Sequence, residues 1–113
     1  MKVIDVTKMS KDERVQCLNE IKCLKNLKNP FINRYRESFM YNKKYLCIIM
    51  NYCSNGDLSG YLKKRRSQKK YLSEDEILNW FTQICLGLKC IHDTAIIHRD
   101  LKTQNIFITG HNN

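Results

Sequence analysis

Eight consecutive residues near the end of the chain, His98 to Asn105, combine groups that could act together in one chemical step. Asp100 supplies a carboxylate, Lys102 an ammonium group and Asn105 a carboxamide. Groups of these three kinds can orient a hydroxyl, neutralise negative charge and bind a metal ion. The segment is therefore the first candidate for a catalytic loop. The alternative is that these eight residues occur together by chance on an ordinary solvated loop.

The length and composition of the chain are those of one modest globular domain. Of its 113 residues, 42% are hydrophobic and 27% are charged, which are ordinary values for a globular protein. No stretch approaches the roughly 20 apolar residues that a membrane span requires. The start does not resemble a signal peptide, because Asp5 places an acid inside the would-be apolar region. These features predict an intracellular protein without a membrane span.

The cysteines of the chain do not form a recognisable disulfide or zinc framework. None belongs to a C-x-x-C pair, and several fall on apolar faces of predicted elements, where cysteine acts as a small hydrophobic side chain. We therefore expect six reduced thiols, at Cys17, Cys23, Cys47, Cys53, Cys85 and Cys90.

The net charge of +9 raises the question of an anionic partner, because basic surfaces attract phosphate backbones. Six of the eight residues at 63–70 are basic, and such a block usually forms a solvated, mobile connection. Aromatic residues are not interleaved with it as they are on surfaces that stack single strands. A small basic nucleic-acid-binding protein is thus a disfavoured alternative. Contact of the block with a membrane surface stays open.

The first half of the chain is predicted to contain a strand, a helix and two further strands. Residues 3–6 are predicted to be the end of a strand. The helix begins at its cap, Ser10, and ends before Asn29-Pro30, because proline disfavours helical geometry in the residue before it. The two later strands are predicted around 32–39 and 44–50. Ser10 and Glu13 form a capping box. The strand at 44–50 is apolar nearly throughout, which predicts cover on both faces. Helical spacing predicts one buried stripe, made of Val15, Leu18, Ile21 and Leu24.

The second half of the chain is predicted to be mainly helical. A turn at 54–57 leads into a short helix capped by Asp57 and ending near Leu62. Ser73 and Glu76 form a second capping box, which opens a long helix to about Asp93 with an apolar period of 3.6 residues. A short strand at 106–109 follows the octamer.

The order of these elements, together with four sequence segments, resembles a protein kinase domain. The octamer fits the catalytic-loop pattern H-R-D-L-x-x-x-N at every fixed position. Within the kinases, the chain is similar to the NIMA-related (NEK) serine/threonine kinases over about 2–109. The residues that carry the likeness lie at 35–39, 50–58, 80–88 and 92–107.

This resemblance implies an α+β fold that is one part of a kinase domain. Residues 1–50 would be a remnant of the small-lobe sheet with its helix, and 51–57 would be the hinge. Residues 58–113 would be the start of the large lobe, with its first helices and the catalytic loop. The family also implies a cytoplasmic location, with cytoskeletal association or the nucleus as alternatives.

The resemblance gives each polar residue of the octamer a role. Asp100 would accept or orient the proton of the attacking hydroxyl, and Asn105 would offer its amide oxygen to Mg²⁺. Lys102, at a position typical of serine/threonine kinases, would be a point charge near the transferring phosphate. Arg99 would pair with a phosphorylated activation loop. The implied reaction transfers the γ-phosphate of ATP to serine and threonine hydroxyls of protein substrates.

The resemblance also places a pair of charges at the nucleotide. Lys2 lies where kinases carry the strand lysine that holds the α- and β-phosphates, and Glu20 lies where its ion-pair partner sits. Taken alone, Lys2 could be a solvated terminal lysine and Glu20 an ordinary surface acid.

The adenine and ribose contacts would come from the segment that joins the lobes. Met50 would be the gatekeeper at the back of the adenine pocket. Asn51, Tyr52 and Cys53 would form the hinge, whose backbone groups pair with the adenine edge. Asp57 would lie near the ribose hydroxyls. Each residue could instead serve ordinary strand or turn structure.

The sequence departs from the kinase pattern at both ends. It contains no G-x-G-x-x-G before Lys2 and no D-F-G or A-P-E after Ile108. The phosphate cover, a magnesium carboxylate and the substrate platform are therefore missing, so we expect a kinase fragment that is inactive alone. Part of the apolar stripe of the long helix should then face water. The second hypothesis is a non-catalytic, pseudokinase-like interaction module.

Overall fold

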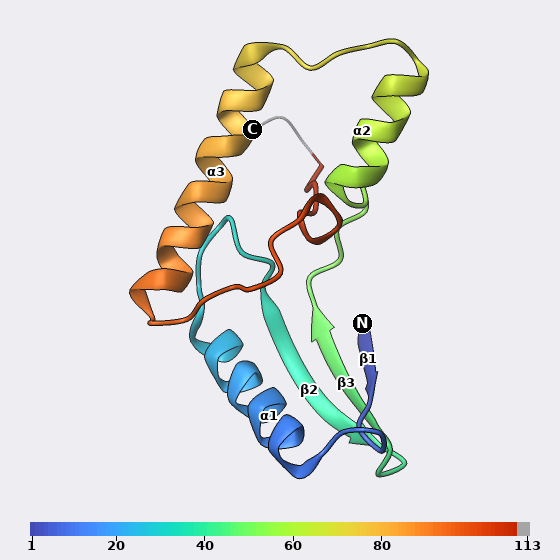
Figure 1. Ribbon diagram of the computed structural model, residues 1–113, viewed down its shortest axis with the longest axis vertical. Helices are drawn as coiled ribbons and strands as arrows, with labels where there is room; N and C mark the ends of the chain where they lie inside the picture. The colour runs from blue at the N-terminus through green and yellow to red at the C-terminus, as the bar shows by residue number, and fades with distance from the viewer. Residues whose placement is uncertain (111–113) are drawn as a thin grey trace. The chain divides into compact units, whose positions relative to one another are not determined.

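The computed structural model describes residues 1–110, which form parts of two compact units. The first unit comprises 1–52 and the second begins at Cys53, so the division lies inside the range expected for the hinge. Along the chain the elements follow the predicted order of strand, helix, two strands and two helices, and a short 3₁₀ helix comes last (Figure 1). The predicted α+β class is confirmed.

The first unit is built on a three-stranded antiparallel sheet in the order β1-β3-β2, formed by β1 (Lys2–Asp5), β2 (Tyr35–Tyr41) and β3 (Tyr45–Met50). The apolar strand β3 is central, and its consecutive residues Leu46, Cys47 and Ile48 are all buried. Successive side chains of a strand point to opposite faces. Both faces of β3 are therefore covered, as its composition predicts.

Helix α1 (Lys11–Asn26) begins with the predicted capping box. The Glu13 amide donates to Ser10 Oγ at 3.2 Å, and the Ser10 amide donates to Glu13 Oε2 at 2.6 Å. The predicted stripe is only partly correct, because Val15 and Leu18 are 51% and 54% exposed. The core instead includes Ile21 together with residues of the sheet and of the segment after β1, and Cys17 packs against it.

We expect Ile48→Ala to be strongly destabilising. Ile48 is 5% exposed and shares the core with Val6, Ile21 and Leu46, so truncation leaves a cavity that costs about 2–5 kcal/mol. Urea unfolding followed by circular dichroism measures this loss. Val3→Ala, on an exposed position of the same sheet, is the matched control and should cost less than about 1 kcal/mol. Equal losses in the two variants would contradict this account of the core.

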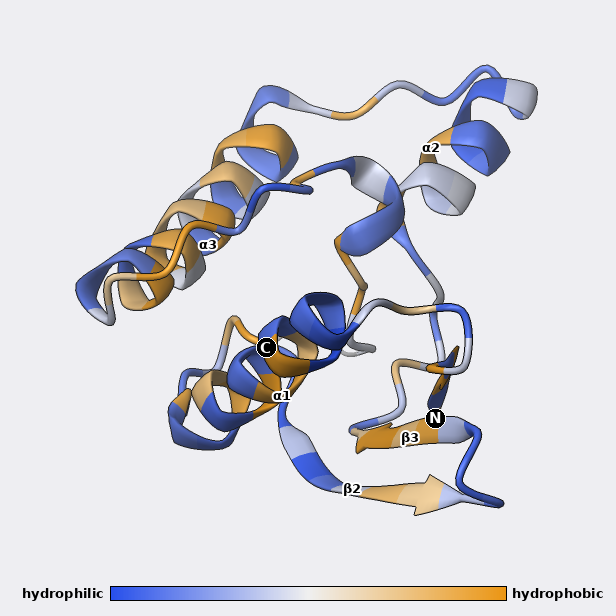
Figure 2. Cartoon of the chain, turned by 60° about the horizontal axis from the view of Figure 1, so that its bottom comes forward, coloured by the Kyte–Doolittle hydropathy of each residue, from blue (hydrophilic) through white to orange (hydrophobic). Residues whose placement is uncertain are grey.

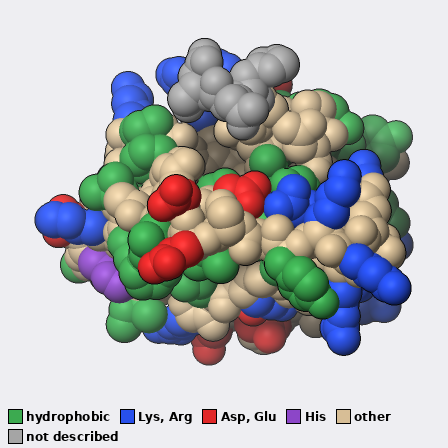
Figure 3. Space-filling view, turned by 90° about the horizontal axis from the view of Figure 1, so that it is seen from above, with side chains coloured by type: hydrophobic (Ala, Val, Ile, Leu, Met, Phe, Trp, Pro, Cys, Tyr) green, Lys and Arg blue, Asp and Glu red, His purple; other side chains and the backbone are tan. Residues whose placement is uncertain are grey.

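The second unit contains helices α2 (Leu58–Ser67) and α3 (Glu74–Asp93). The expectation of a mobile basic connection at 63–70 is wrong for its first part, because α2 continues through Ser67. Arg65 explains this extension: its guanidinium donates to Glu76 Oε2 at 3.2 Å and to the Tyr71 carbonyl at 2.9 Å. The remaining cations lie at the negative end of the helix dipole, which favours them. Figure 3 shows basic side chains at several places on one face of the molecule, at some of which an acidic side chain lies beside them.

Helix α3 has the predicted bounds and capping box, and its apolar side chains are only partly covered. Trp80 stacks edge-to-face on Tyr61 of α2, with ring centroids 5.3 Å apart. In contrast, Ile77 and Phe81 are 50% and 61% exposed. The apolar residues run along the whole helix in Figure 2. The expected exposure of part of this stripe is therefore confirmed.

Candidate functional site

The three polar residues singled out in the octamer lie together in the second unit. The Asn105 amide nitrogen Nδ2 donates to the Asp100 carbonyl at 2.9 Å and to its carboxylate oxygen Oδ2 at 3.1 Å. The Lys102 ammonium lies 3.0 Å from the other carboxylate oxygen, Oδ1. Each oxygen of Asp100 thus has one neighbour that fixes its direction, and all three side chains stay open to solvent.

Local backbone geometry holds this constellation. The 3₁₀ helix η1 (Thr103–Asn105) turns the chain back, with the Asn105 amide donating to the Lys102 carbonyl at 2.9 Å. Arg99 has a φ of 67°, a left-handed conformation that is uncommon for residues other than glycine. The His98 side chain supports this local conformation, because its Nδ1 accepts a hydrogen bond from the Asp100 amide at 3.2 Å. The sequence pattern did not single out His98 as a site residue; its place two residues before Asp100 was the signal.

The octamer is anchored to the start of α2 by a short antiparallel pairing. The Leu58 amide donates to the Ile106 carbonyl at 2.7 Å, and the Ile108 amide donates to the Gly56 carbonyl at 2.9 Å. The strand expected at 106–109 is reduced to this bridge, centred on Asp57 and Phe107. The residues after Asn105 are thereby tied to the first turn of a helix, which restrains the loop at its C-terminal end.

The electrostatics of Asp100 keep its carboxylate ionised. The hydrogen bond from Lys102 is the main cause of a pKa below the ordinary value of 3.8, and the Asn105 bond and the nearby positive charge act in the same direction. A carboxylate with a lowered pKa is a weak base at neutral pH. The arrangement therefore suits Asp100 to orient a hydroxyl and to receive its proton late, rather than to remove that proton beforehand.

Lys2 and Glu20, the expected phosphate-binding pair, both belong to the first unit. Lys2 begins β1 opposite Ile48 of β3, and Glu20 is exposed on α1. Burial raises the pKa of the Cys17 thiol, the Glu20 charge raises it further, and the Lys2 charge lowers it, so both charges act on one side chain. Within residues 1–110 no ion pair joins Lys2 to Glu20. Their pairing stays a prediction.

The expected adenine-binding residues fall at the end of the first unit and the start of the second. Met50 ends β3 and packs against the core. The Asn51 amide donates to the Arg34 carbonyl at 3.0 Å and is therefore engaged. Contact of Tyr52 and Cys53 with adenine stays a prediction. Asp57 caps α2, since its Oδ1 accepts from the Gly60 amide at 2.8 Å. Asp57 therefore has a structural task beside the expected contact with ribose.

Asn105 is the one residue expected to bind magnesium, and the amide oxygen of its side chain is free for such a role. Asn105 uses its nitrogen toward Asp100, and within residues 1–110 its amide oxygen has no hydrogen-bond partner. Mg²⁺ prefers such oxygen ligands together with carboxylates and phosphates. No group of three or more His, Cys, Asp or Glu side chains is placed to hold a metal ion in this part of the chain. Nor does any of its helices have the length and apolarity needed to cross a membrane.

Comparison with known proteins gives one consistent result. The profile of the family described as "Protein kinase domain" matches residues 1–113. The chain is 48% identical over 110 residues to mouse serine/threonine-protein kinase Nek1 and 46% identical over 109 residues to the probable serine/threonine-protein kinase nek3 of Dictyostelium discoideum. It is 43% identical over 109 residues to human serine/threonine-protein kinase Nek5. Each match covers 96% of this chain and 9%, 10% and 15% of the relative's length, respectively.

Proposed function

The chain belongs to the protein kinase family and is similar to NEK serine/threonine kinases, and from this we propose that it is part of a serine/threonine protein kinase. The complete enzyme would transfer the γ-phosphate of ATP, as its magnesium complex, to serine and threonine side chains of proteins. Its relatives are far longer than this chain, so the activity is proposed for the longer protein.

The arrangement of Asp100, Lys102 and Asn105 is the observation that carries this proposal. The Asp100 carboxylate is held from both sides, by Lys102 at 3.0 Å and by Asn105 at 3.1 Å. An attacking hydroxyl needs such a fixed acceptor, because phosphoryl transfer depends mainly on positioning and charge neutralisation. Lys102 can neutralise charge on the transferred group, and the free oxygen of Asn105 can bind Mg²⁺.

The six cysteines supply an argument about location. All are free thiols, which is the ordinary state of cysteine in a reducing compartment. We therefore propose the cytoplasm as the place where the kinase works.

We expect the 113 residues alone to transfer no phosphate above background. They contain neither a G-x-G-x-x-G sequence to cover the phosphates nor a D-F-G aspartate for magnesium, and electrostatic stabilisation of the transition state contributes most to catalysis of this reaction. A longer protein that includes both motifs should phosphorylate a generic serine/threonine substrate. Incorporation of labelled phosphate from ATP, measured on both proteins, tests this.

Two outcomes would contradict the proposal. One is a longer protein, with both motifs present and a folded domain, that binds no ATP and transfers no phosphate; this would favour the non-catalytic interaction module. The other is transfer by the 113 residues alone that disappears in Asp100→Asn, which would show that these motifs are dispensable.

A further inference from the structure

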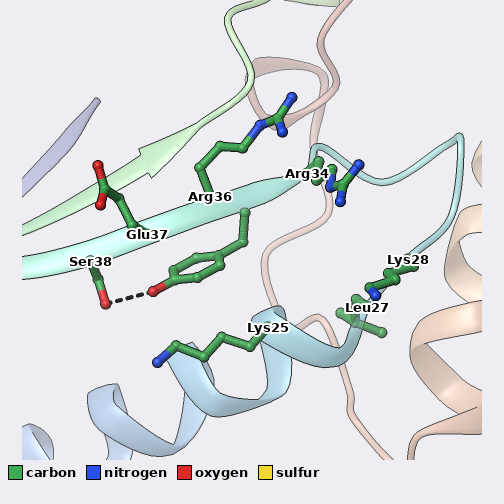
Figure 4. A pocket seen from close by; sticks show the side chains of 8 residues that line it. Lys25, Leu27, Lys28, Arg34, Arg36, Glu37 and Ser38 are labelled. Atoms are coloured by element: carbon green, nitrogen blue, oxygen red, sulfur yellow. Dashed lines mark hydrogen bonds between the residues drawn. The ribbon is translucent and has the colours of Figure 1, made fainter.

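A pocket of about 420 Å³ lies in the first unit, where α1 ends and β2 begins. Figure 4 shows Lys25 on the last turn of α1, Lys28 just after this helix, and Arg34 just before β2. Arg36 lies within β2, and its guanidinium points to the opposite side of the strand from Lys25. None of these residues belongs to the catalytic loop or to the expected nucleotide contacts. The lining is completed by Leu27, Tyr35, Glu37 and Ser38.

The pocket is strongly cationic, and its charges are not balanced by the protein. Residues 21–36 contain five basic side chains and no acidic one. Within residues 1–110 none of Lys25, Lys28, Arg34 and Arg36 forms an ion pair, and Glu37 is the single acid in the lining. Like charges gathered in this way repel one another, and a bound anion would relieve the repulsion.

Several contacts hold the lining of the pocket in place. Lys25 Nζ lies over the Tyr35 ring, 5.8 Å from its centroid. The Tyr35 and Ser38 hydroxyls lie 2.7 Å apart and share a hydrogen bond. Arg36 Nε donates to Asn51 Oδ1 at 2.7 Å, which fixes the direction of its guanidinium. Cations held in place by their neighbours lose less conformational entropy when an anion binds.

We propose that this pocket binds a phosphate group carried on a serine or threonine side chain of a protein segment. Such a phosphate carries about two negative charges and three acceptor oxygens, which match the lysine and guanidinium donors of the lining. The segment can come from elsewhere in the longer protein or from a separate partner. The proposal goes beyond the proposed catalysis and does not depend on it, because it uses no residue of the octamer.

The shape of the site favours a single phosphate over a polymer or a surface. Nucleic acids and membranes require an extended basic face, whereas these cations belong to the lining of one recess of about 420 Å³. Proteins that bind single strands also offer exposed aromatic faces for stacking. Tyr35 is the only aromatic side chain in the lining; its ring is half-buried and lies beneath Lys25.

Lysine protection in the complete protein tests the proposal directly. The probe is a short glycine–alanine peptide with one central phosphoserine, and its unphosphorylated twin is the control. The phosphopeptide should slow acylation of Lys25 and Lys28 by a limiting amount of an active ester, as measured by mass spectrometry. Lys63 and Lys64, in the basic block of α2, should react at an unchanged rate, and the twin should protect none of the four.

Two matched double variants test whether the protection of Lys25 arises from binding at this pocket. Lys28→Gln with Arg34→Gln should raise the phosphopeptide concentration that half-protects Lys25 by about tenfold or more, because charge-assisted hydrogen bonds are lost. Both substituted side chains are exposed, so the fold should persist. Lys63→Gln with Lys64→Gln removes the same charge from the second unit and should change this concentration by less than about twofold.

Phosphatase treatment distinguishes a phosphate of the same protein from one that a partner supplies. If the phosphate lies in the same protein, phosphatase treatment without added peptide should speed acylation of Lys25; if a partner supplies it, the rate should not change. Protection by the twin, equal protection of Lys63 and Lys64, or stronger protection by single-stranded DNA or anionic vesicles than by the phosphopeptide would each overturn it.

Discussion

Asp100→Asn should lower kcat of the complete kinase at least about a thousandfold, while the KM for ATP changes little. Asparagine has nearly the same shape, but its single oxygen can accept from only one of the two neighbours, Lys102 or Asn105. The bond from Asn105 to the Asp100 carbonyl does not involve the substituted group, so the loop should keep its form. The substitution removes the negative charge that we propose orients the hydroxyl and receives its proton. Steady-state kinetics with a peptide substrate separate the effect on kcat from any effect on ATP binding.

Asp93→Asn is the matched control for this substitution. Asp93 is also an exposed carboxylate of the second unit with a lysine partner, Lys89, whose Nζ lies 2.7 Å from its Oδ2. Loss of one surface ion pair costs at most about 1 kcal/mol of stability, so this variant should keep nearly full activity. A comparable loss of activity in both variants, or an Asp100→Asn enzyme with more than about a tenth of normal kcat, would refute the role given to Asp100.

Asn105→Ala is expected to produce the second-largest loss, with a kcat lower by about a hundredfold or more. It removes both hydrogen bonds to Asp100, at 2.9 and 3.1 Å, together with the amide oxygen proposed to bind magnesium. The variant should therefore also require a higher Mg²⁺ concentration for half-maximal rate. Titration of activity with Mg²⁺ at saturating ATP measures both changes.

Asn105→Asp separates the two tasks of this side chain. Aspartate keeps an oxygen for the metal but cannot donate to Asp100, so we expect kcat to stay low while the Mg²⁺ requirement returns toward normal. Asn79→Ala, which removes an exposed amide from α3, should change neither quantity. An unchanged Mg²⁺ requirement in Asn105→Ala would disprove the metal role, and full activity in Asn105→Asp would disprove the positioning role.

The elements that could be predicted from the sequence are those held by contacts between near neighbours. The two capping boxes join residues three apart, Ser10 with Glu13 and Ser73 with Glu76, and both are present at the expected helix starts. Hydrogen bonds of this kind depend on local backbone geometry and little else. The catalytic constellation is local in the same sense, because only five positions separate Asp100 from Asn105.

The parts that the sequence did not predict depend on contacts between distant segments. The length of α2 follows from Arg65 reaching Glu76 across the loop, and no pattern within 63–70 reveals that partner. Which face of α1 is buried depends on how the helix packs against the sheet. Helical periodicity alone therefore predicted that Val15 and Leu18 are buried, although both are exposed. The short pairing of 56–58 with 106–108 joins segments about fifty residues apart.

The sequence by itself determined the family and the order of the main elements, because these are set by residue types at short spacings. Only the tertiary structure decided how the Asp100 carboxylate is held, that the Asn51 amide is already engaged, and that cations near the end of α1 and the start of β2 line one pocket. Lys25 and Arg34 are ordinary surface residues in the sequence. They become a candidate site because the fold places the end of a helix beside the start of a strand.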